Sequence, residues 1–163
     1  KDLLDDLQRF ADDRNMSRSE ALASELRACL SAPLIEFRDT TAAPERVVYR
    51  GSEGFEAAKQ LHNMRVSWRV SPNAVVYAGS TEEVAHAVRC AMVSRLPVYG
   101  RSGANAFESY CERGCVLVDV SRLKRVEVDA AARTAVLGAG LNLGQTYYHL
   151  YQRGFTIPGG TCH

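Results

Sequence analysis

The chain has 163 residues, of which 46% are hydrophobic and 24% are charged, a composition typical of a globular domain that excludes disordered and fibrous proteins. Its 20 basic and 19 acidic side chains leave a net charge of +1, so the basic excess expected of a nucleic-acid-binding protein is absent. No apolar run approaches the roughly 20 residues that span a membrane, and the sequence contains no signal peptide. The five cysteines include no Cys-x-x-Cys pair and do not indicate a zinc site.

The N-terminal part of the chain predicts one helix. Ser17 and Glu20 have the spacing of a capping box, and the apolar residues that follow have helical spacing. Residues 34–52 show no clear period. We therefore interpret residues 1–71 as an N-terminal helical extension and lead-in, and residues 72–163 as a separate domain portion.

A strand–helix–strand unit is predicted next. Residues 74–78 form a short apolar run suited to a buried strand. Thr81 is the expected N-cap of the following helix, with acidic residues in its first turn. Residues 96–99 form a second short strand that leads into a glycine-containing loop. Such a unit is predicted to be parallel.

The remaining elements alternate in type. Residues 116–120 predict a third apolar strand, and residues 125–129 and 134–138 predict a hairpin about a polar turn. Residues 141–153 predict a helix, which Gly154 ends as its C-cap.

The loop at residues 100–106 is a candidate anion site. Gly100 and Gly103 can take positive φ angles, which would let successive backbone N–H groups converge. Such an arrangement, with the Ser102 hydroxyl and Arg101 nearby, suits a pyrophosphate. An ordinary strand-to-loop turn is the alternative interpretation, and the spacing leaves both open.

Residues 138–140 resemble the start of a dinucleotide-binding fingerprint, but the spacing fails. The third glycine should stand where the chain has Leu143, and Gly144 comes one residue late. A tight turn between strand and helix is predicted instead.

Cys162 lies among polar and glycine residues outside any apolar period, which favours a chemical role, although a structural role stays open. His62, His86 and His149 lack metal-ligand spacing, so no metal site is predicted. No catalytic triad or carboxylate pair can be assigned, and the catalytic residues stay unknown.

Three segments taken together resemble the berberine-bridge-enzyme-like FAD-linked oxidases of the vanillyl-alcohol-oxidase superfamily. The segments are 72–110, 116–140 and 143–162, and they contain Arg-Ser-Gly at 101–103 and Gly-Thr-Cys at 160–162. Each motif alone is weak, but their order and spacing are specific.

The resemblance implies an α/β (α+β) fold of the PCMH-type FAD-binding domain. A small parallel βαβ layer is followed by the start of an antiparallel sheet, which is incomplete because the chain stops after its Gly-Thr-Cys motif. The implied function is that of an FAD-dependent, oxidase-like oxidoreductase. Hydride would pass from an alcohol or amine carbon of a small molecule or sugar to FAD, with dioxygen or another electron acceptor. The fragment is expected to be inactive alone, because the family's catalytic base and substrate-binding sheet lie beyond residue 163.

The resemblance also implies a set of cofactor-binding residues. These are Gly100, Arg101, Ser102, Gly103, Ala104, Asn105, Ala106, Gly160, Thr161 and Cys162. Asn105 stands where the family has a flavin-linked histidine, so we expect a single cysteinyl link through Cys162 or no covalent link. A flavin-free descendant that acts as a binding or structural module, and another kind of nucleotide-binding enzyme, are the alternatives.

Cys29 and Cys90 resemble a disulfide pair of plant members of this family, and two reduced core cysteines are the alternative. Cys111 and Cys115 could also pair, although the family pattern does not support it. A disulfide would imply a secreted protein or one of the secretory pathway.

Overall fold

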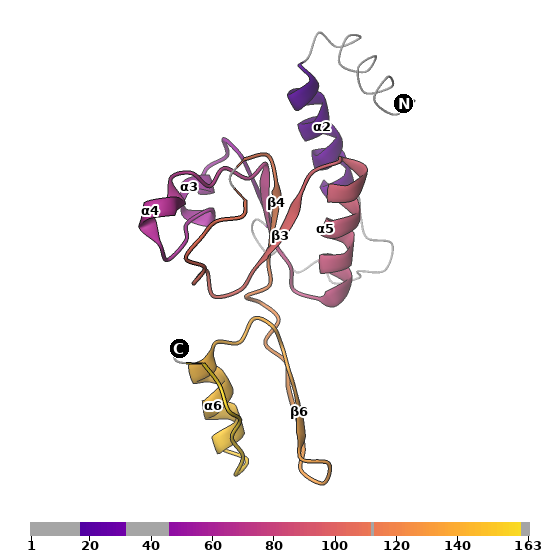
Figure 1. The fold of residues 1–163 in the computed structure, drawn as a ribbon. Coiled ribbons are helices and arrows are strands. Elements are labelled where there is room, and N and C mark those ends of the chain that lie inside the picture. The colour runs from indigo at the N-terminus through magenta and orange to yellow at the C-terminus, as the bar shows by residue number, and fades with distance from the viewer. Residues whose placement is uncertain (1–16, 32–45, 112, 161–163) are drawn as a thin grey trace.

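The computed structural model describes residues 17–31, 46–111 and 113–160. Figure 1 shows a sheet with helices on both faces, and a hairpin with one helix that extend away from it. In chain order the elements are α2 (Arg18–Ser31), β1 (Val47–Tyr49), α3 (Phe55–Ala58), α4 (Met64–Ser67), β2 (Ala74–Tyr77), α5 (Thr81–Val93), β3 (Val98–Arg101), β4 (Val116–Asp119), β5 (Val126–Asp129), β6 (Thr134–Leu137) and α6 (Leu143–Tyr151). Within these ranges, none of the helices has the length and apolar character that crossing a membrane requires.

The four-stranded sheet has the order β1-β2-β4-β3. β2 and β3 both pair with β4 in parallel, and β1 runs antiparallel to β2 at one edge. The predicted strand–helix–strand unit is therefore confirmed as parallel, with β4 inserted between its two strands. All residues of β4 are buried, as expected of a strand that is covered on both faces.

Successive residues of the central strands point to opposite faces of the sheet, so each face packs against different helices. Val76 and Val118 lie in the core shared with α2 and α5. Val75 and Leu117 lie in the core on the other side, with Phe55 of α3. This packing fixes the register of β2 and β4, because a slip of one residue would exchange the two sets of side chains.

A disulfide joins α2 to α5. The Cα atoms of Cys29 and Cys90 lie 5.6 Å apart and their sulfurs are bonded, which confirms the pairing that the family resemblance implies. The bond closes a sequence separation of 61 residues, for which the chain-entropy model gives a stabilisation of about 4 kcal/mol.

The predicted capping box of α2 is also confirmed. The Ser17 N–H donates to the Glu20 carboxylate at 2.7 Å, and the Glu20 N–H donates to the Ser17 hydroxyl at 3.4 Å. The hydroxyl and the N–H of Ser17 both lower the pKa of the Glu20 carboxyl by hydrogen bonding to it.

Three elements before residue 72 have no signal in the sequence. β1, α3 and α4 contain only three or four residues each, too few for a hydrophobic period. β1 pairs with β2, so residues on both sides of the proposed boundary at 71/72 share one sheet.

Two boundaries differ from the sequence prediction. Ser80, not Thr81, caps α5, because Ser80 has an extended backbone and its hydroxyl accepts the Glu83 N–H at 3.2 Å. β3 begins at Val98 and continues through Arg101, two residues later than predicted, because its pairing with β4 carries the strand into the first residues of the loop.

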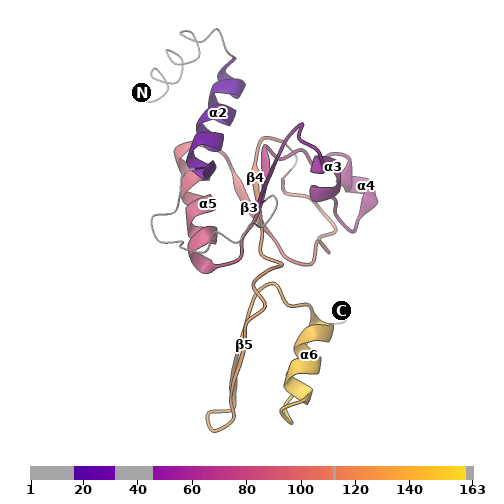
Figure 2. The ribbon, with the colours of Figure 1, turned by 180° about the vertical axis from the view of Figure 1, so that it is seen from behind.

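The second part of the chain matches its prediction closely. β5 and β6 form the antiparallel hairpin, and Figure 2 shows α6 beside it from behind. Asn142 and Gln145 form a capping box at the start of α6. The helix ends at Tyr151 with Gln152 as its C-cap, two residues before the predicted end. The turn that follows closes where Gly154 takes a φ of +76° and the Phe155 N–H donates to the Leu150 carbonyl at 3.0 Å.

A tight backbone turn connects the hairpin to α6. The Gly138 N–H donates to the Arg125 carbonyl at 2.8 Å, and the Gly140 N–H donates to the Leu123 carbonyl at 2.9 Å. A Cβ atom on Gly138 would collide with the Leu123 carbonyl, and one on Gly140 with the Val120 carbonyl. Both glycines therefore serve close backbone approach, which confirms the tight turn that the failed fingerprint spacing predicts.

Two neighbouring glycines test this interpretation. Gly140→Ala should lower the free energy of unfolding by about 1–3 kcal/mol, because the Cβ forces the backbone apart. Gly144→Ala places its Cβ no closer than 3.6 Å to another atom, and should raise stability by up to about 1 kcal/mol through helix propensity. Urea unfolding followed by circular dichroism measures both. Equal effects of the two substitutions would contradict the close approach.

Candidate functional site at the loop after β3

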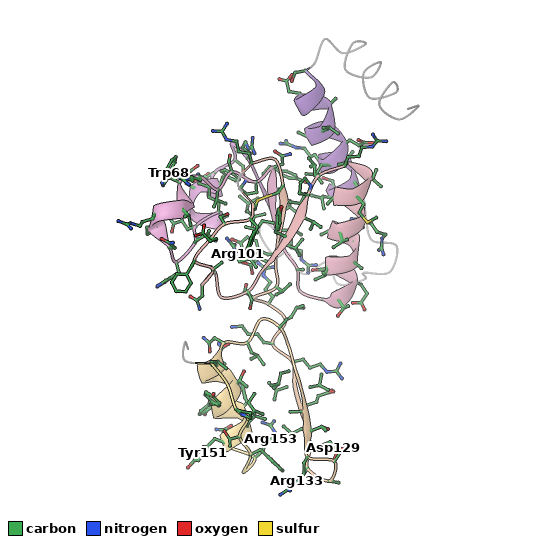
Figure 3. All side chains as sticks on the ribbon, in the orientation of Figure 1. Trp68, Arg101, Asp129, Arg133, Tyr151 and Arg153 are labelled. Carbon is green, nitrogen blue, oxygen red and sulfur yellow. A yellow bond between two sulfur atoms is a disulfide. The ribbon has the colours of Figure 1, made fainter. Side chains whose placement is uncertain are left out.

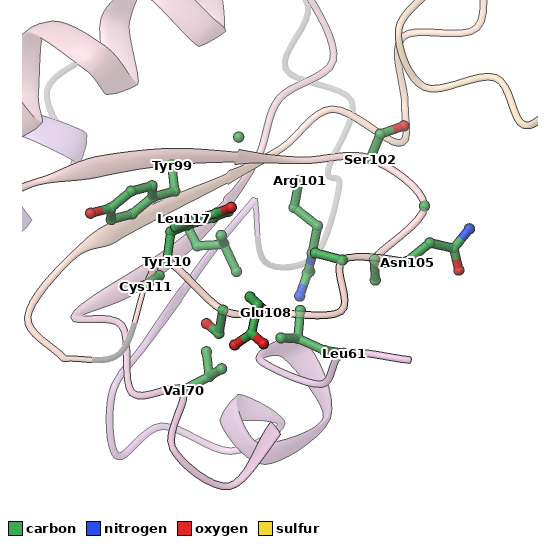
Figure 4. Close-up of a pocket in the computed structure, with 15 residues that line it drawn as sticks. Leu61, Val70, Tyr99, Arg101, Ser102, Asn105, Glu108, Tyr110, Cys111 and Leu117 are labelled. Carbon is green, nitrogen blue, oxygen red and sulfur yellow. The ribbon is translucent and has the colours of Figure 1, made fainter. Parts of the chain in front are cut away.

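The loop after β3 borders a cavity of about 230 Å³, lined by all of residues 100–106. Leu61 and Val70 form an apolar wall opposite the loop, and Leu117 of β4 lies at its base (Figure 4). The volume is below the range of about 300–1,000 Å³ typical of small-molecule pockets. The cavity can therefore hold only part of a large cofactor.

Arg101 anchors the start of this loop. Its Nε donates to Asp119 Oδ2 at 2.6 Å, and one of its terminal nitrogens donates to the carbonyls of Ala58 at 2.6 Å and Gln60 at 3.3 Å. The two charged side chains are only 8% and 5% exposed. The second carboxylate oxygen of Asp119 accepts the Ser121 N–H at 2.9 Å.

The charge of Arg101 is thus balanced inside the protein. The sequence interpretation places this guanidinium near a pyrophosphate, but its nearest charged partner is Asp119. Figure 3 shows Arg101 within the sheet part, far from Asp129 and Arg133 at the hairpin tip. What the geometry supports for Arg101 is a positioning role: it ties the loop to β4 and to the end of α3.

The expected glycine conformations in the loop are wrong. Among the described residues, neither Gly100 nor Gly103 has a positive φ, and Ala104 takes the left-handed conformation instead, with a φ of 56°. Gly100 is held in β3 opposite Val118, so the chain turns only after the strand has ended.

Residues before β2 hold the middle of the loop. The His62 N–H donates to the Ala104 carbonyl at 3.0 Å, and the Asn63 side-chain amide donates to the Phe107 carbonyl at 2.7 Å. The Asn63 Oδ1 also accepts the Arg65 N–H at 3.1 Å and caps α4. Neither contact can be read from the sequence, since His62 acts through its main chain. The only available signal was Asn63, a favoured N-cap residue.

Ser102 links the loop to the second part of the chain. Its hydroxyl donates to the Ala139 carbonyl at 2.6 Å, within the glycine turn between β6 and α6. The hydroxyl that the sequence assigns to an anion is therefore used here to join the two parts.

The loop retains unused hydrogen-bond donors. In the part of the chain that the structure describes, no hydrogen bond uses the backbone N–H groups of residues 102–106. All five residues line the cavity, and none carries an acidic side chain. A run of free N–H groups beside a cavity is suited to binding an anion such as a phosphate.

The remaining predicted site residues divide between the cavity, which Asn105 and Ala106 line, and the end of the described chain. Asn105 is exposed, and its amide points away from Arg101 (Figure 4). Gly160 is exposed beside α6, with Leu143 as the near contact, and it is not part of the cavity lining. Thr161 and Cys162 lie outside the described residues.

One group of potential metal ligands occurs in the described ranges, formed by Cys29, His86 and Cys90. The two sulfurs are bonded to each other, so neither can act as a thiolate ligand. His86 contacts the Cys29 carbonyl at 3.2 Å and the Cys90 sulfur at 3.5 Å.

Comparison with known protein families matches residues 72–163 to an FAD binding domain. The chain belongs to this FAD-binding domain family. The match begins at the lead-in to β2 and includes the whole cavity loop.

Relatives agree with this assignment. The FAD-linked oxidoreductase pynB of Aspergillus niger is 32% identical over 152 residues, which cover 90% of this chain and 27% of that protein. Glucooligosaccharide oxidase of Sarocladium strictum is 29% identical over 143 residues, which cover 85% and 26%. The chain therefore spans about a quarter of the length of the curated relatives it matches.

A solved structure supports the fold. The wild-type BBE-like 1 protein of Physcomitrella patens is 32% identical, with a TM-score of 0.69 over 84% of this chain and 28% of that one. The resemblance to berberine-bridge-enzyme-like FAD-linked proteins is thus confirmed. So is the mixed α/β fold, with its parallel layer, antiparallel hairpin and incomplete extent.

The anchor of the cavity loop can be tested by measuring stability. Asp119→Asn leaves the buried Arg101 charge without its partner, and should lower the free energy of unfolding by about 3–5 kcal/mol. The control is Glu127→Gln, which breaks the ion pair with Arg125. Both side chains are exposed, Glu127 by 52% and Arg125 by 71%. An exposed pair contributes about 0–1 kcal/mol. Urea unfolding measures both variants, and similar losses would show that Asp119 is not the anchor.

Proposed function

We propose that this chain forms the N-terminal, cofactor-binding part of an FAD-dependent oxidoreductase of the oxidase type. The observation that carries the proposal is the run of free N–H groups at residues 102–106, which lies within the segment that matches an FAD binding domain. The relatives named above as an FAD-linked oxidoreductase and a glucooligosaccharide oxidase support the reaction class. The substrate would be a small molecule or sugar with an oxidisable alcohol or amine carbon.

The residues of this chain would act by positioning. The N–H groups of 102–106 would donate to the diphosphate oxygens of FAD, and Arg101 with Asp119 would hold the loop that carries them. When bound, FAD would supply the hydride acceptor, and dioxygen or another acceptor would reoxidise it. The cavity fits part of the cofactor, which agrees with a chain that spans about a quarter of its relatives.

Covalent attachment would involve Cys162. Its thiolate is the nucleophile that the family's Gly-Thr-Cys motif offers to the flavin, and Gly160 and Thr161 would place it. Asn105 has no imidazole, so a histidyl link at this position is chemically impossible. The proposal is a single cysteinyl link.

Two disulfides support a location in the secretory pathway or outside the cell. Cys29 pairs with Cys90, and Cys111 pairs with Cys115. Disulfides persist in oxidising compartments and are rare in the cytosol.

Asn105 also supports a second candidate function, that of a flavin-free binding module descended from the enzymes. The visible absorption spectrum of the full-length protein separates the two functions. A yellow protein with flavin bands supports the oxidoreductase, and a colourless protein that takes up no added FAD supports the module.

The anion site can be tested with two variants of Asn105, one of which is nearly isosteric with the native residue. Asn105→Asp places a negative charge at the loop, and repulsion from the diphosphate should raise the Kd for FAD about five- to tenfold. Asn105→Ala removes the same amide without adding charge and should change the Kd less than about twofold. Titration of full-length protein carrying Cys162→Ala, in which FAD binds reversibly, gives both constants. Equal constants would place the diphosphate elsewhere.

Attachment has its own test. Full-length wild-type protein should give a fluorescent flavin band after denaturing electrophoresis, and Cys162→Ala should abolish it. A band that survives the substitution would show that the flavin is linked at another residue.

A further inference from the structure

The last part of the cavity loop depends on a second disulfide. Cys111 and Cys115 are bonded, with Cα atoms 5.8 Å apart. Cys111 is 4% exposed and lines the cavity, whereas Cys115 is 1% exposed and is not among the lining residues. The bond therefore connects the cavity wall to a residue outside it.

Cys115 is itself held firmly by the sheet. Its carbonyl accepts the Asn73 N–H at 2.7 Å, and the neighbouring Gly114 N–H donates to the Ser71 carbonyl at 3.2 Å. Val116, the next residue, begins β4 in the core. Cys115 is thus fixed by the segment before β2 and by β4, and the disulfide restrains Cys111 at a set distance from it.

Within the described residues, the segment before Cys111 is not held by hydrogen bonds. Residues 108–111 make no backbone hydrogen bond there, and Tyr110 is 76% exposed. The nearest hold on the N-terminal side is the contact between Asn63 and the Phe107 carbonyl. The bond is therefore what closes the wall between Phe107 and β4.

The Cys111–Cys115 bond closes a small loop of the chain. Its main effect is therefore on the shape of the folded protein, and its effect on the entropy of the unfolded chain is smaller. It joins residues separated by 4 in sequence, whereas Cys29 and Cys90 are separated by 61. In the chain-entropy model the loss of unfolded-state entropy increases with loop length. The longer loop should therefore contribute more to stability, and the shorter one more to the shape of the cavity.

We propose that the Cys111–Cys115 disulfide is a positioning element of the FAD site, which holds the loop in its cofactor-binding shape. This inference rests on the proposed function. A loop whose shape is fixed before binding loses little conformational freedom when FAD binds. Breaking the disulfide would therefore weaken the affinity for FAD.

The experiment measures FAD affinity and thermal stability together, in full-length protein carrying Cys162→Ala. Cys111→Ala/Cys115→Ala should raise the Kd for FAD about tenfold through lost preorganisation. The matched control, Cys29→Ala/Cys90→Ala, should leave the Kd within about twofold while lowering the Tm more, because it opens the longer loop. If the variant with the larger loss of Tm also shows the larger rise in the Kd for FAD, the affinity reflects stability alone and the positioning role is overturned.

Single variants separate the bond from the contact that Cys111 makes with the cavity. Cys115→Ala breaks the same bond without changing a lining residue, so it should weaken binding as much as Cys111→Ala. A loss confined to Cys111→Ala would overturn the proposal and assign the effect to a direct contact. If wild-type full-length protein binds no FAD, the proposed function fails together with this inference. If the wild type binds FAD and Cys111→Ala/Cys115→Ala binds it equally well, only this inference is overturned.

A reductant replaces any variant that does not fold. Folded Cys29→Ala/Cys90→Ala protein, otherwise wild type, retains the Cys111–Cys115 bond of the two disulfides that the described residues form. Tris(2-carboxyethyl)phosphine gives two electrons to this disulfide and becomes the phosphine oxide with the oxygen of one water, whose protons go to the two thiols. Hydrogen exchange in the peptide covering 102–110 of the FAD-bound protein should then accelerate about tenfold. Unchanged exchange would overturn the proposal.

Discussion

The buried ion pair between Arg101 and Asp119 determines where the cavity loop leaves the sheet. The two residues are register partners at the ends of β3 and β4, and the same guanidinium reaches the carbonyl of Ala58 at the end of α3. Such a pair adds little net stability compared with apolar residues, but an unpartnered charge in its place is costly. The pair therefore selects one arrangement of the two strands, α3 and the loop over the alternatives.

The rest of the site is assembled from parts of the chain that lie far apart in sequence. His62 and Asn63 hold the loop from one side, and Ala139 receives the Ser102 hydroxyl from the other. His62, Asn63 and Ala58 all lie before residue 72, where the match to the FAD-binding domain begins. The residues that shape the cavity loop thus extend beyond the segment that matches the family, and β1 and α3 belong to the same structural unit.

Elements with a strong hydrophobic period could be predicted from sequence, and short or contact-dependent features could not. α5, α6 and the hairpin show their periods directly, and the glycine turn follows from spacing that fails for a dinucleotide site. β1, α3 and α4 are too short to show a hydrophobic period. Contacts with the sheet stabilise them instead, as the pairing of β1 with β2 and the packing of Phe55 against Val75 show. The role of Arg101 required the position of Asp119, which the sequence shows only as an acid at the end of an apolar strand. The sequence favours a glycine for the left-handed position of the loop, whereas Gly100 is paired in β3 and Ala104 takes that conformation.

The bond between Cys29 and Cys90 has a topological consequence. It makes a covalent ring of the chain between α2 and α5, which encloses β1, α3, α4 and β2. A protease that cuts once inside this ring leaves two chain segments that stay joined through the disulfide and can separate only after reduction. The ring also tethers α2 to its own α5, so two copies of the protein cannot exchange this helix while the bond is intact.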